Sequence, residues 1–392
     1  MLPIAEYDYH LPPDLIAQTP AEPRDHSRLL VLHRDSDTLE HRHFYDVLRF
    51  LRPNDLLVVN DSRVLPARLH GHKPSGGRIE ILLLRQVDAV RWEALVKGKV
   101  AVGTQIVFEG RGSGVGGREL GIGNQHSGSG KWEVGSESQL QSPTTNHQPP
   151  TTDLFLVPSP EPLAPLLATV EQILDNGSRV LRFEQPINDV LSNYGVMPTP
   201  PYITAPLADP ERYQTVYSAN LGSAAAPTAG LHWTPTLIER AKTLGVRWAS
   251  VTLHVGLDTF RPVQTENALD HPMHSEWYEL PAATATAINE TRAAGGRVIA
   301  VGTTSVRVLE TVASQQNAQT IATSSGWTNI FIYPPYQFRL VDGLITNFHL
   351  PRSTLLLLVS ALAERAQILR AYQAAIAQHY RFFSFGDAML IV

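Results

Sequence analysis

The chain has 392 residues, of which 43% are hydrophobic and 18% charged, a globular composition that is sufficient for two or three domains with a sizeable core. It contains no cysteine, which excludes disulfides, thiolate metal sites, iron–sulfur clusters and a cysteine nucleophile. The net charge of −5 counts against a non-specific nucleic-acid binder but leaves room for a local basic surface. With no bilayer-spanning apolar stretch and no signal-peptide pattern, we expect a cytoplasmic protein without membrane contact.

The first half of the chain is rich in short extended segments. Two apolar runs, Leu29–Leu32 and Asp55–Val59, predict strands. Further short runs follow, separated by glycines, and a last pair flanks an Asp-Asn-Gly turn that is typical of a hairpin. We therefore expect a small antiparallel β-barrel or sandwich. Its strands are predicted at Arg63–Leu69, Arg78–Leu84, Arg91–Lys97, Gln105–Phe108, Thr169–Leu174 and Ser178–Phe183.

Residues 110–150 differ in composition from the rest of the chain. They are rich in Gly, Ser, Gln, Thr and Pro, and their few apolar residues are not spaced to form a core face. We expect a long flexible loop between strands of one sheet. A solvated insertion is favoured over a substrate-binding lid, because loops of this composition are usually solvated.

After residue 220 helices and strands alternate. Helix signals include Thr234 as an N-cap before Pro235, and Gly-Gly after Ala294. The pattern predicts an α/β fold: a mostly parallel sheet with flanking helices, interrupted by the inserted barrel. The expected domains are residues 1–60 with 188–392, and residues 61–187. Helices are predicted at 234–244, 283–294, 304–313, 353–363 and 368–378, and strands at 246–255, 297–301, 330–333 and 343–346.

Polar residues follow several of these strands, where α/β proteins place their sites. In one cluster an apolar strand leads into Gly302, Thr303 and Thr304 at a helix start, with Arg307 one turn later. A helix N-terminus suits a phosphate or carboxylate, although plain N-capping by the threonines explains the spacing equally well. The lysine of a Walker A loop and the glycine spacing of a dinucleotide fold are both missing.

Histidines mark the other clusters. The segment 224–233 contains small residues and His232 near a helix start, where a neutral ring is favoured over a charged one, and a purely structural histidine is the alternative. His254 ends a strand, and His274 and Glu276 follow downstream. Their spacing matches no standard zinc motif, so we expect no metal site. His349 and Asp387 lie in two further polar stretches near the carboxyl terminus.

Taken together, these segments resemble the S-adenosylmethionine:tRNA ribosyltransferase-isomerase family of queuosine biosynthesis. The resemblance covers the chain from end to end in order, apart from the stretch after Gly110, which looks like an insertion. The matching segments are 60–69, 75–80, 200–203, 213–218, 225–232, 251–256, 273–276, 301–307, 346–354 and 380–389.

The resemblance implies an α/β domain interrupted by a barrel, and a reaction. S-adenosylmethionine would be consumed as a ribosyl donor, with no permanently bound cofactor. The ribosyl group would be transferred and isomerised onto 7-aminomethyl-7-deazaguanine at the tRNA wobble position, giving epoxyqueuosine-tRNA, adenine and methionine. The sulfonium acidifies the 5′ carbon, so a base is needed, and adenine leaves better when protonated, so an acid is needed.

We expect acid–base residues among the polar clusters, without ranking them. The candidates are His232, His254, His274, Glu276 and His349, with Asp387 behind them. The methionine carboxylate would bind at the helix start beside Arg307. The predicted substrate-binding residues are Thr228, Gly230, Gly302, Thr303, Thr304, Arg307 and Asn347.

Binding of the tRNA requires a local positively charged surface on the protein. Arg63, Arg68, Lys73 and Arg78 concentrate in the predicted barrel, and small barrels often bind oligonucleotides, although a solvated charged sheet face is the alternative. Competing functions are a tRNA methyltransferase that uses S-adenosylmethionine and a non-catalytic RNA-binding module. The chain lacks the Gly-rich nucleotide-binding loop that a methyltransferase would need. A simple RNA-binding module would not need polar clusters at several strand ends. We expect a monomer.

Overall fold

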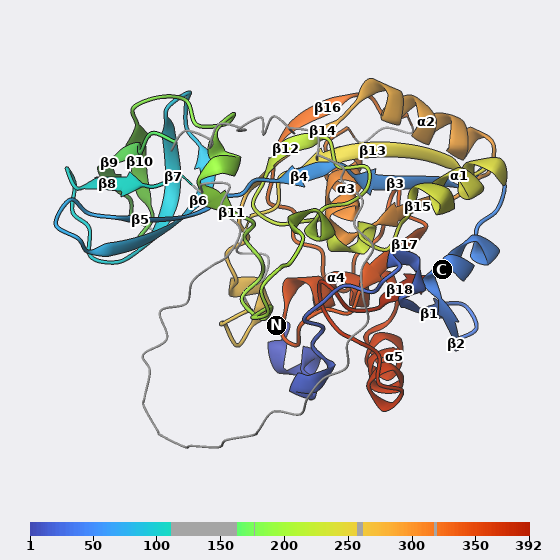
Figure 1. Ribbon diagram of the computed structural model, residues 1–392. Coiled ribbons are helices and arrows are strands. Elements are labelled where there is room, and N and C mark those ends of the chain that lie inside the picture. Colours follow the sequence, from blue (N-terminus) through green and yellow to red (C-terminus); the bar gives the residue numbers. More distant parts are fainter. Residues whose placement is uncertain (111–162, 176, 257–261, 317–319) are drawn as a thin grey trace, which may run out of the picture.

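The computed structural model describes residues 1–110, 163–175, 177–256, 262–316 and 320–392. Its larger part is built on a nine-stranded sheet, and a second, smaller sheet lies beside it (Figure 1). In spatial order the nine strands are β16 (Ser324–Thr328), β14 (Glu276–Leu280), β13 (Arg247–Leu253), β3 (Leu56–Asn60), β15 (Val298–Val301), β17 (Gly343–Asn347), β18 (Ala388–Ile391), β1 (Arg28–His33) and β2 (Thr38–His43).

The large sheet is mixed, so the predicted mostly parallel sheet is not confirmed. β13, β3, β15 and β17 are parallel to one another, and β1 is parallel to β18. The other four neighbouring pairs, β1–β2, β13–β14, β14–β16 and β17–β18, are antiparallel. β1 and β2 show the physical reason: a four-residue connection is too short for the crossover that parallel neighbours require.

Helices cover both faces of this sheet, as predicted. Along β3, Leu56 and Val58 pack into one core with helices α2 to α5, whereas Leu57 and Val59 pack into a second core with α1. This alternation follows from the two-residue period of a strand. The helices are α1 (Pro235–Thr243), α2 (Ala282–Ala293), α3 (Thr303–Gln316), α4 (Thr354–Leu362) and α5 (Arg365–Ala377).

Local signals fixed the start of two helices. The Thr234 hydroxyl accepts a hydrogen bond from the N–H of Leu237, and Ser353 caps α4 in the same way. The predicted strand at 330–333 is wrong. This segment has no regular structure, and the strand lies earlier, at β16, where antiparallel pairing with β14 supplies hydrogen bonds.

The predicted inserted barrel is confirmed. Six antiparallel strands form it, and the pairing of the first with the fourth in chain order closes it around its own apolar core. In Figure 1 the barrel lies to one side of the large sheet. Its strands are β5 (Arg68–His72), β6 (Arg78–Gln86), β7 (Arg91–Lys97), β8 (Gln105–Phe108), β9 (Leu166–Ile173) and β10 (Arg179–Phe183).

One predicted barrel strand is divided in two. The segment expected at 63–69 contains Pro66, which has no N–H to donate. Before it, β4 (Ser62–Val64) pairs with β12 (Asn220–Ser223) outside the barrel, and after it β5 begins the barrel. The exact domain boundaries stay a prediction. Residues 111–150 of the expected flexible loop lie outside the described residues, and no described helix has the length and apolar character to cross a membrane.

Candidate active site

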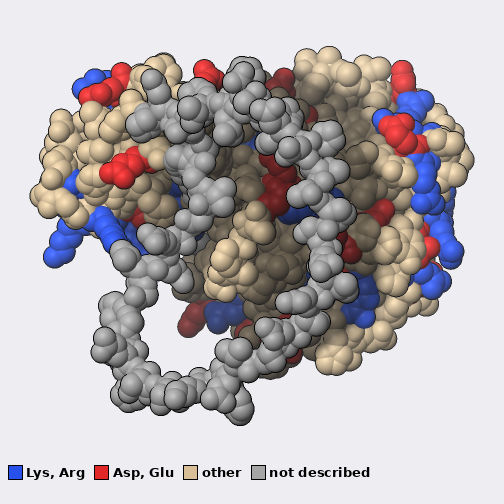
Figure 2. Space-filling view, in the orientation of Figure 1, with Lys and Arg blue, Asp and Glu red and all other residues tan. Residues whose placement is uncertain are grey.

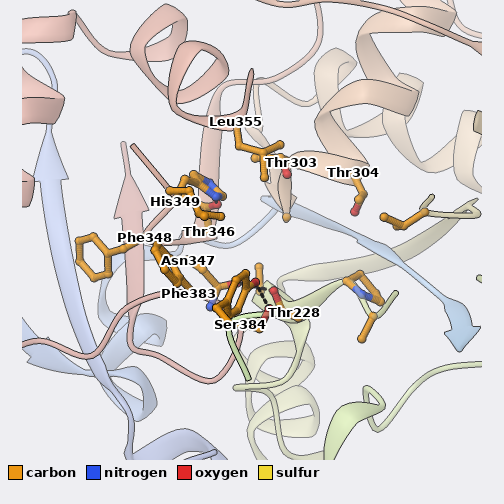
Figure 3. Close-up of a pocket in the computed structure, with 17 residues that line it drawn as sticks. Thr228, Thr303, Thr304, Thr346, Asn347, Phe348, His349, Leu355, Phe383 and Ser384 are labelled. Atoms are coloured by element: carbon orange, nitrogen blue, oxygen red, sulfur yellow. Dashed lines mark hydrogen bonds between the residues drawn. The ribbon is translucent and has the colours of Figure 1, made fainter. Parts of the chain in front are cut away.

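A pocket with about 540 Å³ of empty volume, including open solvent, lies where β15 and β17 end. These strands are parallel, so their carboxyl ends meet at one edge of the sheet. The loop carrying the short 3-10 helix η7 (Thr228–Gly230) completes the wall. We call this cavity the strand-end pocket (Figure 3). It brings together six of the predicted site residues: Thr228, Gly302, Thr303, Thr304, Asn347 and His349.

The start of α3 forms one wall of the strand-end pocket. Gly302 has φ +90°, a left-handed conformation that lets the chain turn directly from β15 into the helix. Thr303 and Thr304 follow and face the cavity (Figure 3). The Thr304 hydroxyl is buried and has no hydrogen-bond partner within the described residues. The unbonded N–H groups of the first helical turn and this hydroxyl form a site suited to an anion.

Across the pocket, a chain of hydrogen bonds links three elements. The Thr228 hydroxyl donates to Asn347 Oδ1 over 2.9 Å, and Asn347 Nδ2 lies 3.3 Å from His232 Nε2. Because the amide nitrogen can only donate, Nε2 is the acceptor and the ring proton lies on Nδ1, 2.7 Å from the Ser27 hydroxyl. Burial lowers the pKa of His232 to about 4, so the ring is neutral at pH 7.

His349 lines the pocket as a second neutral histidine. Its Nε2 lies 2.8 Å from the Thr346 hydroxyl, and its backbone N–H donates to the Tyr372 hydroxyl over 2.9 Å. Burial lowers the pKa of its ring to about 3. At neutral pH this ring therefore acts through hydrogen bonds, because a group with so low a pKa binds a proton weakly.

Tyr202, Phe383 and Ser384 are among the lining residues that sequence reasoning missed. The Tyr202 hydroxyl lies 2.7 Å from the Ser384 hydroxyl, and the rings of Tyr202 and Phe383 are 4.8 Å apart. Phe383 has φ +68°, which is uncommon for a bulky residue and occurs most often at functional sites. Their segments, 200–203 and 380–389, were among the resembling stretches, but no role was predicted for these residues, because aromatic side chains belong more often to a core.

Three other predicted residues lie in a second cavity. This cavity, which we call the cleft, has about 1750 Å³ of empty volume, including open solvent, between the barrel and the large sheet. His254, His274 and Glu276 line it, together with barrel residues such as Arg85 and Trp92. Val255 lines both the cleft and the strand-end pocket, so the two cavities adjoin there.

Arg307 and Glu276 form a buried ion pair. Arg307 was predicted to hold an anion at the start of α3, but its guanidinium turns away from the strand-end pocket to Glu276. Glu276 Oε1 also lies 3.1 Å from His274 Nε2 and accepts the Gly256 N–H over 2.7 Å. Burial raises the pKa of Glu276, but Arg307, His274 and this N–H outweigh it and hold the pKa below its usual value.

His254 is placed differently. It lies directly before Val255, where the cavities adjoin, and its ring stacks on Trp277 at 5.3 Å. Gly222 makes room for it, because a Cβ at that position would lie 2.7 Å from His254 Cε1. Burial lowers the pKa of the ring, with Asp61 opposing the shift. Its Nδ1 is buried without a hydrogen-bond partner in the described part of the chain.

Besides His232 and Arg307, two further predicted residues line neither cavity. Asp387 is buried and accepts the backbone N–H groups of Arg28 and Arg381, which ties the segment before β18 to β1. Gly230 serves packing, since a Cβ there would lie 1.9 Å from the Tyr217 hydroxyl. Both positions therefore support the walls of the site. Among the described residues, no group of three or more His, Cys, Asp or Glu could hold a metal ion.

The four predicted tRNA-binding residues are not one surface. Arg63 lies on β4 outside the barrel and pairs with Ser218 and Glu211, because Pro66 separates it from the barrel strands. Arg68 lies 3.6 Å from Glu80 within the barrel. Lys73 and Arg78 belong to the turn and strand start between β5 and β6. Figure 2 shows Lys and Arg side chains at the outer end of the barrel.

The fold is that of an α/β protein with an inserted β-barrel and a pocket at the strand ends. The comparisons agree on its family. The Queuosine biosynthesis protein family matches residues 4–391, and the chain belongs to this family.

The relatives share the full length of the chain. S-adenosylmethionine:tRNA ribosyltransferase-isomerases of Moorella thermoacetica and Desulforamulus reducens are each 48% identical, with 99% of both chains covered. The crystal structure of an S-adenosylmethionine tRNA ribosyltransferase from Thermotoga maritima matches with a TM-score of 0.51 and 36% identity. This match covers 99% of this chain and 100% of that one.

Proposed function

We propose that this protein transfers and isomerises the ribosyl group of S-adenosylmethionine onto a tRNA. The acceptor is the 7-aminomethyl-7-deazaguanine wobble base of queuosine-type anticodons, and the products are epoxyqueuosine-tRNA, adenine and methionine. S-adenosylmethionine is consumed as a substrate, and the protein acts as a cytoplasmic monomer without a resident cofactor. The names of full-length relatives support the reaction.

The strand-end pocket is the observation that supports a binding site for the donor, S-adenosylmethionine. Its buried Thr304 hydroxyl and the N-terminal N–H groups of α3 suit the carboxylate of the methionine part. An ionised acceptor strengthens each of these hydrogen bonds. Arg307 is excluded from this role because it is already paired with Glu276. Thr303, Thr304 and Gly302 therefore bind the anion without a charged side chain.

Asn347 orients the opposite side of the donor site. Its amide is held by Thr228 and His232, so its position does not depend on the ligand. The neutral His232 keeps this network free of charge at pH 7. A preformed, uncharged wall favours a donor whose own sulfonium is positive, because a nearby imidazolium would repel it.

Proton transfer is assigned to His254. The base must take a proton from the donor 5′ carbon beside the sulfonium, and the leaving adenine must gain one. His254 lies at the junction of the two cavities and is less buried than His232 or His349. Glu276 is unsuited to donating a proton, because Arg307 and His274 hold it ionised. Asp387 acts as a positioning residue through the segment before β18.

The tRNA approaches from the barrel side. Lys73 and Arg78 project near the tip of the β5–β6 hairpin, where the backbone turns at Gly76. Phosphate contacts of this kind give affinity without sequence specificity. They reconcile a net charge of −5 with an RNA substrate, because the positive charge is needed only locally.

Product analysis tests this function. Labelled S-adenosylmethionine is incubated with the protein and with tRNA carrying the precursor base. Free adenine must appear only when both substrates are present, and the tRNA must gain the mass of a ribosyl-derived group. Gain of a methyl group would instead identify the methyltransferase, which the relatives' names do not favour. Absence of adenine would contradict the proposal.

A further inference from the structure

Three aromatic rings form a row across neighbouring strands at the edge of the large sheet. Trp277 on β14 and Trp327 on β16 are paired residues, so their side chains lie on the same face. His254, at the end of β13, stacks on Trp277 with an angle of 20° between the ring planes. We call His254, Trp277 and Trp327 the aromatic row.

The aromatic row lines the cleft and is not part of either core of the large sheet. The indole of Trp327 is 53% exposed, although exposure of so large an apolar group is unfavourable. The barrel faces it with Leu84, Arg85 and Gln86. An exposed aromatic surface inside a cleft that mixes polar and apolar groups is typical of a ligand-binding surface.

The inner end of the row meets the strand-end pocket. His254 directly precedes Val255, which lines both cavities. A flat ligand on Trp277 would therefore lie next to a donor bound at the start of α3. The cleft has about 1750 Å³ of empty volume against about 540 Å³ for the strand-end pocket, open solvent included in both, so the cleft has more room for part of a macromolecular substrate.

We propose that Trp277 and Trp327 stack the acceptor base of the tRNA loop in the cleft, beside the donor. The proposal rests on the proposed function, which supplies a tRNA acceptor. Proteins recognise RNA loops mainly by splaying unpaired bases and stacking them on aromatic rings. The row places such a base in line with His254, so that the amine of its 7-aminomethyl group is directed to the junction of the two cavities.

Alanine and phenylalanine variants test the stacking. Trp277→Ala and Trp327→Ala should each weaken binding of an anticodon stem-loop RNA carrying the precursor base by about 5- to 100-fold. Trp277→Phe and Trp327→Phe keep a ring and should stay within a few-fold of the parent protein. Leu244→Ala, at an exposed position at the end of α1, is the matched control and should have no effect. Circular dichroism confirms that each variant is folded.

An abasic RNA separates stacking from a general effect on the cleft. The parent protein should bind the same stem-loop without the acceptor base as weakly as the alanine variants bind the intact RNA. The alanine substitutions should then cause no further loss. Equal losses on both RNAs would overturn the proposal.

Two further measurements test whether a different ligand binds to the aromatic row. If the alanine variants weaken S-adenosylmethionine binding in calorimetry and leave RNA binding intact, the rings stack the donor adenine instead. If the parent protein sediments as a dimer that Trp327→Ala dissociates, the row binds a second copy. Either result would overturn the proposal. Failure of the parent protein to release adenine from both substrates would contradict the proposed function, independently of these RNA-binding results.

Discussion

The strand-end pocket and the cleft adjoin at Val255 but are lined by different kinds of residues. The pocket is small and is lined by hydroxyl groups, the helix N-terminus of α3 and a neutral histidine. The cleft is about three times larger in empty volume and contains tryptophans and an ion-paired glutamate. The size and lining of the pocket suit a small molecule, and those of the cleft suit part of a macromolecule.

This difference shows how one chain can bring together two unlike substrates. The parallel strands β15 and β17 place the pocket at their carboxyl ends, inside the large sheet's domain. The cleft forms where the barrel lies beside the edge strand β16 and its neighbour β14. The proposed reaction requires the two ligands to meet, and His254 lies beside Val255, where the two cavities adjoin. Four predictions test this division of roles.

The largest effect is expected at the junction. His254→Gln should lower kcat for adenine release by about 10²- to 10⁴-fold, because proton transfer is lost. Binding of S-adenosylmethionine should change little, since the proposed donor site is the strand-end pocket. His10→Gln, at an exposed position, is the control. If His254→Gln retains kcat, proton transfer belongs to the pocket itself and the division of roles is wrong.

The buried neutral histidine behind the pocket should make stability depend on pH. The folded pKa of His232 is about 4, below the value of about 6.5 expected when unfolded, so the unfolded chain binds more protons between these values. Its contribution is complete above pH 6.5 and is lost as pH falls toward 4, by on the order of 3 kcal/mol. Urea unfolding at pH 7 and pH 4.5 measures this loss.

His232→Gln provides the comparison for this pH effect. It lacks the titrating ring, so its stability should fall less between the two pH values, whatever its stability at pH 7. Parallel losses in the parent protein and the variant would show that other groups cause the acid sensitivity.

Removal of the Thr304 hydroxyl should affect the donor alone. Thr304→Val keeps the shape of the side chain and removes one hydrogen bond to a carboxylate, which typically costs about 10- to 100-fold in affinity. Calorimetry with S-adenosylmethionine measures the effect, and tRNA binding should be unchanged. Thr236→Val, on the exposed side of α1, is the matched control. A loss of tRNA affinity instead would place the acceptor in the strand-end pocket.

The smallest effect is expected at the barrel. Lys73→Glu and Arg78→Glu should each weaken tRNA binding a few-fold and reduce the slope of log affinity against log salt by about 0.7–0.9 per lost phosphate contact. Arg49→Glu, whose exposed side chain lies on the short helix before β3, serves as the control. Unchanged slopes for both barrel variants would mean that these residues are only a solvated sheet face.

Sequence patterns predicted much of the fold because their causes are local. The cap at Thr234, the hairpin of β9 and β10 and the strand β8 depend on neighbouring residues and agree with the structure. The pattern failed where pairing partners are distant. β14 pairs with β13 and β16, which are distant in sequence, so the sequence pattern predicted neither β14 nor β16. The mixed strand directions depend on which connections cross over.

The candidate site likewise has residues that the sequence predicts and residues whose position depends on distant strands. Gly302, Thr303 and Thr304 follow an apolar strand directly and could be found from the sequence. Arg307 was misplaced because a one-turn spacing on a helix does not tell which way a long side chain turns, and only Glu276 on a distant strand decides it.

By itself the sequence determined the two-part organisation, the polar strand ends and the family resemblance, since each depends on residue order. Tertiary structure alone decided that the histidines divide between two cavities: His349 lines the strand-end pocket, whereas His254 and His274 line the cleft. It also decided that His232 and His349 are neutral and that Trp277 and Trp327 share an open face. The physical reason is that burial, pKa and the meeting of distant strands depend on packing, which no local pattern encodes.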